Sequence, residues 1–408
     1  MHQTLISLTA VAILSTSWGQ TPTVPPRSPA VGRVVLRAVG SDASRGTAAA
    51  VIVDEGQLVH TAWLAPVDAK GQLQGAGDAR AQASQVLRNL DLALRAAGTS
   101  RAHLVRLHVY VADGSVTPLV DRVFAEQFSG GTQPAVTIVE SRLSIPGALV
   151  AMDAVAATSR RPPTGRPERL VVDGLADTVA DGAHVAIQPA GPFVIVSGRA
   201  APGEFGAAVR GTMEQLRADL VGVGLGFEHV VQVKTFLGDM TRAADVQRLV
   251  AGLFEGTAPP QVVTEWRNSS LPVEIELVAT APGATGGGAR LSFVEPIASR
   301  FSRVARVFAG GPVFVSGLVG ASDNPVTQVR EIFAELGRVL DQVGSDLHHL
   351  AKATYYVSDP GADHEINVIR PTLFDASRPP AASKISVQGT GRPGKGATID
   401  MIAVTTTR

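Results

Sequence analysis

The chain has no cysteine among its 408 residues. This absence excludes a disulfide framework, a thiolate nucleophile, and zinc or iron–sulfur sites with cysteine ligands. Aromatic residues are also scarce, at 5% of the sequence, so the hydrophobic cores must be built mainly from Val, Leu, Ile and Ala. Hydrophobic residues as a whole reach 45%, enough for the two or three domains that the length predicts.

The chain also lacks net charge, because 36 Lys and Arg balance 36 Asp and Glu. Proteins that bind nucleic acids usually carry a basic excess, which displaces counterions from the phosphates. The balance therefore argues against a nucleic-acid partner and makes ribonuclease activity the least favoured function. The histidines show no metal-ligand spacing such as H-E-x-x-H, so no metal site is predicted.

The N-terminus carries an apolar run at residues 5–14, which is too short to span a bilayer. The small residues Ser17 and Gly19 follow it, and this pattern predicts a secretory signal peptide over residues 1–19, although the segment before the run contains no Lys or Arg. The alternative is a buried N-terminal helix. The proline-rich residues 20–31 are typical of an extended tether. No later stretch is long enough to cross a membrane, so we expect a secreted or periplasmic protein.

The rest of the chain is one unit repeated three times. Three β-branched and aromatic runs each end at an aspartate, and these aspartates, Asp113, Asp239 and Asp359, lie 126 and 120 residues apart. Around each run the same elements recur: two opening strands, an amphipathic helix, the run itself, a second helix and two closing strands. The pattern predicts three tandem α+β domains, each a mixed sheet with two helices on one face. Their expected bounds are residues 32–158, 168–281 and 290–408.

Several local patterns resemble the RidA/YjgF family of enamine/imine deaminases, historically also described as endoribonuclease L-PSP. The residues that carry this resemblance are Asn89-Leu90, Ala96-Ala97-Gly98, the strand Val105–Asp113, Gly147–Ala156, and Phe301–Val304 with Val313–Gly317. It covers residues of about 32 to 408 and implies a chorismate mutase-like fold. Because the family forms homotrimers with ligand clefts between subunits, three copies in one chain imply an intramolecular pseudo-trimer, and we expect a monomeric chain.

The resemblance also implies a carboxylate-binding arginine, which this chain lacks. In the family, an arginine after the Pro-Ala of a late strand pairs with the substrate carboxylate, which its planar fork suits. The matching residues here are Val136, Val262 and Ala382, so all three anchors are lost. We therefore expect a cofactor-free protein that binds small molecules at inter-repeat clefts, either without catalysis or with altered chemistry. The alternative is an enamine/imine deaminase that hydrolyses 2-imino acids to 2-keto acids and ammonia.

Other pocket positions of the family survive unevenly and are best kept in the third copy. Glu274 is a candidate to activate water, and its alternative role is that of a half-exposed strand residue. Lys384 is a candidate cation for an anionic ligand, and its alternative is a solvated lysine at a strand edge. Phe301 is a candidate aromatic cover for a ligand or a core residue. The candidate ligand-binding residues are Lys384, Ser316, Gly317, Asn367, Phe301 and Arg303.

Overall fold

The computed structural model describes residues 32–129, 131–177, 182–297 and 300–406. The expected signal peptide (1–19) and tether (20–31) lie outside the described residues. Gly32–Arg408 forms one unit. None of the helices in the described ranges is long and apolar enough to cross a membrane.

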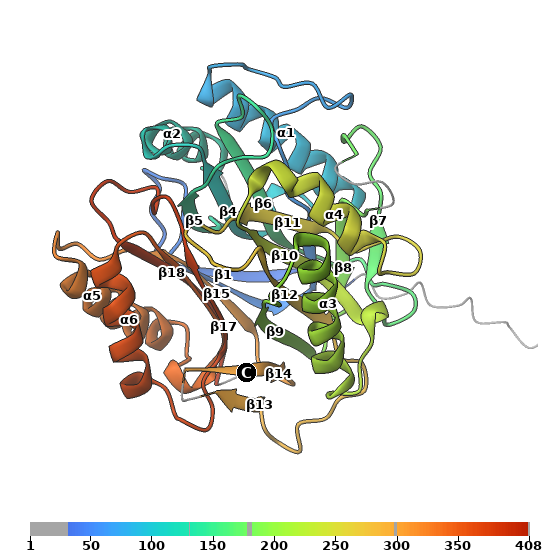
Figure 1. The fold of residues 1–408 in the computed structure, drawn as a ribbon, viewed down its shortest axis with the longest axis vertical. Coiled ribbons are helices and arrows are strands. Elements are labelled where there is room, and N and C mark those ends of the chain that lie inside the picture. The colour runs from blue at the N-terminus through green and yellow to red at the C-terminus, as the bar shows by residue number, and fades with distance from the viewer. Residues whose placement is uncertain (1–31, 130, 178–181, 298–299, 407–408) are drawn as a thin grey trace, which may run out of the picture. The chain divides into compact units, whose positions relative to one another are not determined.

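In the described residues, each repeat supplies six strands and two α-helices (Figure 1). Three strands precede the first helix, one more than predicted, and the other elements follow in the predicted order. The first repeat contains β1 (Val35–Val39), β2 (Ala50–Glu55), β3 (Gln57–Thr61), α1 (Ala79–Ala96), β4 (Leu104–Val111), α2 (Thr117–Gln127), β5 (Ala135–Glu140) and β6 (Val150–Thr158). The second contains β7 (Glu168–Leu170), β8 (Val185–Gln188), β9 (Phe193–Arg199), α3 (Phe205–Val221), β10 (Val230–Leu237), α4 (Ala243–Ala251), β11 (Gln261–Glu265) and β12 (Val273–Thr280). The third contains β13 (Leu291–Ile297), β14 (Phe301–Val307), β15 (Pro312–Leu318), α5 (Pro325–Gln342), β16 (Leu350–Val357), α6 (Pro360–Leu373), β17 (Ala381–Ser386) and β18 (Ala397–Val404).

The ends of the first helix in the first and third repeats follow local sequence rules. Asp78 caps α1 by accepting a hydrogen bond from the backbone N–H of Ala81, and Asn324 caps α5 by accepting from Thr327. Gly98 and Gly344 follow the C-terminal ends of these helices with φ of 71° and 69°, a left-handed conformation that favours glycine. Each helix then covers one face of a sheet with its apolar side.

The opening hairpin of each repeat pairs with the sheet of a different repeat. Hairpin β1–β2 continues the third repeat's sheet through β2–β15, hairpin β7–β8 continues the first repeat's sheet through β3–β8, and hairpin β13–β14 continues the second repeat's sheet through β14–β9. Only Gly56 separates β2 from β3, so the chain passes there from one sheet to the next. Each six-strand layer is therefore completed by another repeat, which the sequence pattern did not predict.

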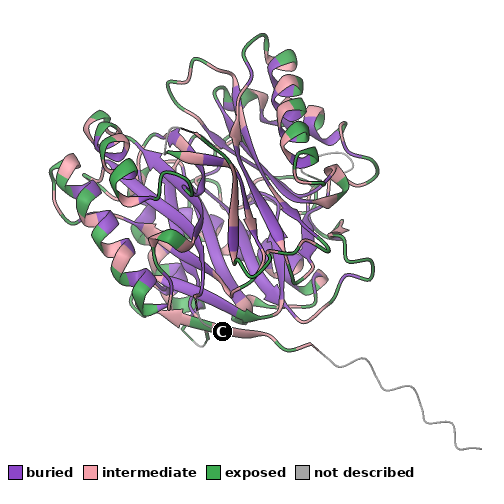
Figure 2. Cartoon of the chain, turned by 90° about the horizontal axis from the view of Figure 1, so that it is seen from below, coloured by how far each residue is buried: buried purple, intermediate pink, exposed green. Residues whose placement is uncertain are grey.

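Two kinds of hydrophobic core result from this exchange. Three outer cores lie between a sheet and its two helices, and each also contains residues from the incoming hairpin, such as Val185, Val304 and Ile52. An inner core joins all three repeats through residues such as Val155, Ile195 and Phe314. Figure 2 shows the strands almost continuously buried and the helices exposed on their outer faces. The predicted fold class, three tandem α+β repeats arranged as a pseudo-trimer, is confirmed.

The hairpin exchange can be tested by cross-linking, because the chain has no native cysteine to interfere. Ala50 on β2 pairs with Val315 on β15. Directly opposed residues of antiparallel strands have Cα atoms about 4.5–5.5 Å apart, within the range of a disulfide. We expect the Ala50→Cys/Val315→Cys variant to form an intrachain disulfide, detected as linked peptides after proteolysis without reductant.

The control is the Ala50→Cys/Ala62→Cys variant. A hairpin folded back within its own repeat at Gly56 would place Ala50 opposite Ala62. We expect this second variant to stay reduced, and efficient linkage of Ala62 instead of Val315 would contradict the exchange.

Candidate functional site

The edge strand of each sheet sets the position that corresponds to the family's arginine. In the first repeat Val136 pairs with Leu107, and in the third Ala382 pairs with Ala353. Both partners lie six residues before the aspartate that ends the β-branched and aromatic run of their repeat. The equivalent residue in the second repeat is Val233, which pairs with Gln261. The anchor position of the second repeat is therefore Gln261.

This register shows that the position of the family's arginine in the second repeat lies one residue before Val262. Val262 lies in an apolar cluster with Trp63 and Tyr110, on the inner side of the sheet. Gln261 instead donates from Nε2 to the backbone oxygen of Gln247, at 3.0 Å. Two consecutive prolines, Pro259 and Pro260, precede the strand and permit both alignments, and the sequence pattern alone does not choose between them. None of the three anchor positions holds a cation.

Ser316 and Gly317 join the third repeat to the first. Ser316 Oγ donates to the backbone oxygen of Val136 at 2.7 Å, and the Val136 N–H donates to Ser316 Oγ at 3.3 Å. A Cβ on Gly317 would lie 2.9 Å from Thr137 Cα, so this close approach requires glycine. Both residues thus hold two strands together across the repeat boundary.

Lys384, Asn367, Phe301 and Arg303 lie around the boundary between the second and third repeats. Lys384 Nζ donates to Asp363 Oδ1 at 2.6 Å and to Asn367 Oδ1 at 3.2 Å, so its charge is already paired. The Arg303 guanidinium lies over the Phe301 ring, 5.2 Å from its centroid. At the same boundary, Ser197 Oγ accepts from the backbone N–H of Ala382 at 2.8 Å, as Ser316 does opposite Val136. The expected third-copy residues therefore separate between two repeat boundaries.

Glu274 lies on β12 at the same boundary, against Gly198, where any Cβ would overlap its carboxyl group. Burial raises the pKa of Glu274 to about 8; a hydrogen bond with Ser383 lowers it, and the nearby Glu276 raises it. The carboxyl group is therefore protonated at neutral pH. It can donate a proton there, and it becomes a base only in alkaline solution.

The boundary between the first and second repeats differs from the other two. His60, Ile195 and Phe314 occupy equivalent positions in the three repeats. Their strand partners are Val155, Val278 and Ile402, and each partner lies two residues after an acidic residue: Asp153, Glu276 and Asp400, respectively. Counting on from these residues, Ala62-Trp63 stands where the other boundaries have Ser197-Gly198 and Ser316-Gly317. Tryptophan, the amino acid with the largest side chain, thus occupies a position that is glycine at the other two boundaries. Trp63 is only 5% exposed.

Beside Trp63 lies a cavity of about 300 Å³, lined by both repeats. Its main apolar lining residues are Trp63, Leu64, Val67, Ile145, Leu175 and Met240. Polar side chains in the lining form hydrogen bonds with the backbone of the cavity wall. Asn89 donates to the backbone oxygens of Ala65 and Val67, and His184 Nε2 bonds the Ala176 oxygen. Among the described residues no Lys or Arg lines it, and the one acidic residue in this lining, Asp177, is exposed. The cavity suits an uncharged ligand.

Comparison with known proteins identifies the family. The sequence model described as Endoribonuclease L-PSP matches the chain three times, at residues 47–158, 179–281 and 294–405. The chain therefore belongs to this family, which confirms the resemblance to RidA/YjgF proteins. A comparison with curated proteins gave no match.

Solved structures that resemble the chain each cover about the length of one repeat. The Rid-family protein YyfB from Yersinia pestis is 28% identical over 30% of this chain and 98% of its own, with a TM-score of 0.29. The YjgF gene product from E. coli is 28% identical over 26% of this chain and 84% of its own, with a TM-score of 0.24. A YjgF/YER057c/UK114 family member from Mycobacterium tuberculosis is 22% identical, covering 31% and 96%, with a TM-score of 0.22.

The raised pKa of Glu274 predicts a pH-dependent stability. The folded pKa, about 8, lies above the ordinary value of 4.5, so folding favours the protonated form. Its contribution is fully present below pH 4.5 and is lost as the pH rises towards 8. We expect the melting temperature of the wild type to fall relative to that of Glu274→Gln over this interval, measured by differential scanning calorimetry. Exposed Glu255→Gln is the control, and parallel pH profiles for wild type and Glu274→Gln would contradict the assignment.

Proposed function

We propose that this member of the family is a binding protein for a small, uncharged and largely apolar molecule, held in the cavity between the first and second repeats. The observation that carries the proposal is the 300 Å³ cavity with Trp63 in its wall and no basic residue in its lining. Enclosed apolar surface with a few convergent polar groups is the usual character of a small-molecule site.

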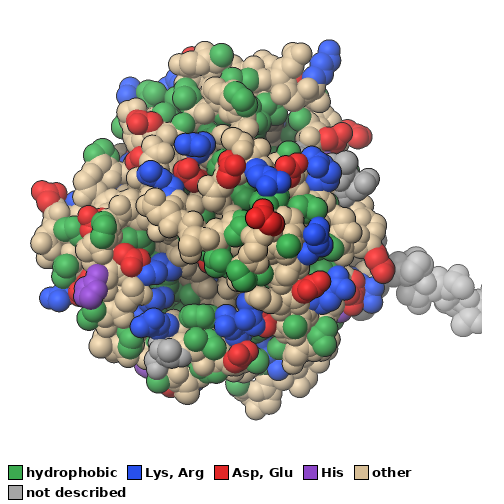
Figure 3. Space-filling model, viewed as in Figure 1, with side chains coloured by type: hydrophobic (Ala, Val, Ile, Leu, Met, Phe, Trp, Pro, Cys, Tyr) green, Lys and Arg blue, Asp and Glu red, His purple; other side chains and the backbone are tan. Residues whose placement is uncertain are grey.

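The loss of charge at the anchor positions supports binding without the family's hydrolysis. Val136, Gln261 and Ala382 offer no cation to a carboxylate, and Lys384, the nearest substitute in sequence, is paired with Asp363. Acidic and basic side chains are interspersed over the face shown in Figure 3, so that face presents no extended basic surface to attract anions.

A second candidate function rests on Glu274 alone. Hydrolysis of an imine consumes one water and releases a ketone and ammonia, and a protonated carboxyl group can deliver the proton that the departing nitrogen needs. The raised pKa of Glu274 and its position at the boundary of the second and third repeats favour a residual imine hydrolase there. Such an enzyme would have to act without a carboxylate anchor.

The binding proposal predicts a preference between two ligands of equal shape. We expect indole to bind and indole-2-carboxylate not to bind, because a desolvated carboxylate would meet no cation in the cavity. Ala243→Leu, which adds volume to the lining, should weaken indole binding by roughly tenfold, about 1.4 kcal/mol. Isothermal titration calorimetry measures both effects.

The matched control for this experiment is Ala207→Leu, an exposed position on α3 outside the lining. Indole binding that is unchanged by Ala243→Leu would place the ligand elsewhere. Stronger binding of the carboxylate than of indole would contradict the proposal.

The anchor argument predicts a gain of function at the boundary of the second and third repeats. Ala382→Arg should restore binding of pyruvate, because a charge-assisted pair adds about 2–3 kcal/mol, a factor of roughly 30 to 150 in affinity. Ala382→Gln, which copies the residue at this position in the second repeat, is the uncharged control and should bind no pyruvate. Hydrolysis of 2-aminoacrylate should be very slow in the wild type, and efficient wild-type turnover would favour the second candidate function.

A further inference from the structure

The inner face of the three sheets carries a cluster of buried charged residues that the proposed function does not use. Strand β4 contributes Arg106 and His108, the equivalent positions of β10 contribute Gln232 and Lys234, and β16 contributes Lys352. The acidic members are equivalent to one another and come from the neighbouring strands β6, β12 and β18: Asp153, Glu276 and Asp400. All of these side chains are buried.

The three carboxylates are already fully engaged. Asp153 accepts from Tyr110 Oη at 2.6 Å and from His108 Nδ1 at 3.1 Å. Asp400 accepts from His108 Nε2 and lies 3.5 Å from Arg106 Nη1. Glu276 accepts from Lys352 Nζ and, at 2.8 Å, from Ser383 Oγ.

Both ring nitrogens of His108 therefore face carboxylate oxygens. Because an ionised carboxylate only accepts hydrogen bonds, both nitrogens must donate, and His108 is an imidazolium. Burial, the largest single effect, would raise the pKa of Asp153 and of Asp400. The nearby cations, His108 foremost, and the hydrogen bonds together outweigh it, so both carboxylates have a pKa below the ordinary value. The hydrogen bonds of His108 with Asp153 and Asp400 are thus mutually consistent.

Lys234 is the member without an acidic partner. In the described residues its Nζ has two hydrogen-bond partners, Tyr356 Oη at 2.8 Å and His108 Nδ1 at 3.5 Å. Since His108 Nδ1 donates to Asp153, it has no lone pair for Lys234. Burial lowers the pKa of Lys234, and the nearby carboxylates Asp153, Glu276 and Asp400 oppose this shift. When Lys234 is charged, four cations, Arg106, His108, Lys234 and Lys352, face three carboxylates. The nearby Glu274 and His60 do not alter this balance, because burial leaves both uncharged at neutral pH, with pKa values of about 8 and about 4.

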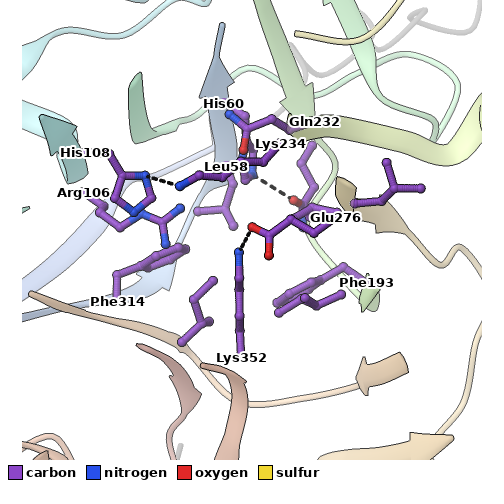
Figure 4. A pocket seen from close by; sticks show the side chains of 15 residues that line it. Leu58, His60, Arg106, His108, Phe193, Gln232, Lys234, Glu276, Phe314 and Lys352 are labelled. Atoms are coloured by element: carbon purple, nitrogen blue, oxygen red, sulfur yellow. Dashed lines mark hydrogen bonds and ion pairs between the residues drawn. The ribbon is translucent and has the colours of Figure 1, made fainter. Parts of the chain in front are cut away.

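A cavity of about 20 Å³ lies at the centre of the cluster, as Figure 4 shows. All four cations line it, whereas Glu276 is the one carboxylate in its lining. Two of its buried polar atoms have no partner in the described chain, Arg106 Nε and His60 Nδ1. The volume is sufficient for a single particle of the size of a water molecule.

We propose that this cavity holds one monatomic anion of the halide class. A water molecule would satisfy the free acceptor of His60, and an anion would satisfy the free donor of Arg106. The positive charge of Lys234, which has no carboxylate partner, favours the anion over the water molecule. An unpaired charge in a protein interior is far more costly than an unpaired neutral acceptor. The anion neutralises the cluster and accepts from Lys234 and Arg106. This site is separate from the ligand cavity of the proposed function.

The experiment loads the cavity during folding, because its surroundings are buried. The full chain is unfolded in urea and refolded in sodium bromide, and crystals are measured at the bromine absorption edge. We expect an anomalous peak among Arg106, Lys234 and Lys352. A cavity containing only water, with no anomalous signal, would overturn the proposal.

A solution measurement gives an independent result. Wild-type protein refolded in sodium chloride should melt at a higher temperature than protein refolded in sodium gluconate at equal ionic strength, because a ligand of the folded state stabilises it. Lys234→Met, which keeps the shape and removes the excess charge, should abolish this difference. The exposed substitution Lys70→Met is the control and should leave it intact. Equal melting temperatures of the wild type in the two salts would also overturn the proposal.

Discussion

The pairing of each opening hairpin with another repeat's sheet is the constraint on which the structure depends. Without β2, the strand β15 would expose a row of unpaired backbone groups, and the same holds for β3 without β8 and β9 without β14. Completing each sheet in this way also fixes where the repeats meet. The clefts, the inner apolar core and the buried charges all lie between strands that these pairings hold in register.

Much of the fold could be predicted from the sequence because its signals are local. The spacing of Asp113, Asp239 and Asp359 reports the repeat, and the caps Asp78 and Asn324 report the helix starts. The exchange of hairpins leaves no such signal. An apolar strand such as β2 has the same pattern whether it pairs within its own repeat or with another one. The difference depends on contacts between residues more than two hundred positions apart.

The site was less predictable because one-residue shifts change which side chain faces a cleft. Matching Pro260 with Pro134 led to Val262, whereas the strand pairing selects Gln261. Likewise, Thr61-Ala62 is more similar to Ser-Gly in the sequence, whereas the strand pairing places Ala62-Trp63 at the Ser-Gly position. The charge cluster could not be predicted for another reason. Its members lie on strands of three repeats, and the sequence does not show that these strands meet.

The hairpin exchange has a consequence for the order of events during synthesis. Ile52 pairs with Val313, so the first hairpin must wait while about 260 further residues are made. At ordinary elongation rates of roughly 5–20 residues per second, this delay is on the order of tens of seconds. During that time the apolar strand β2 has no sheet to join, and the first repeat's own sheet must wait for β8. The ring of exchanged hairpins therefore closes only when the last repeat has emerged, and until then β2 lacks its partner strand β15.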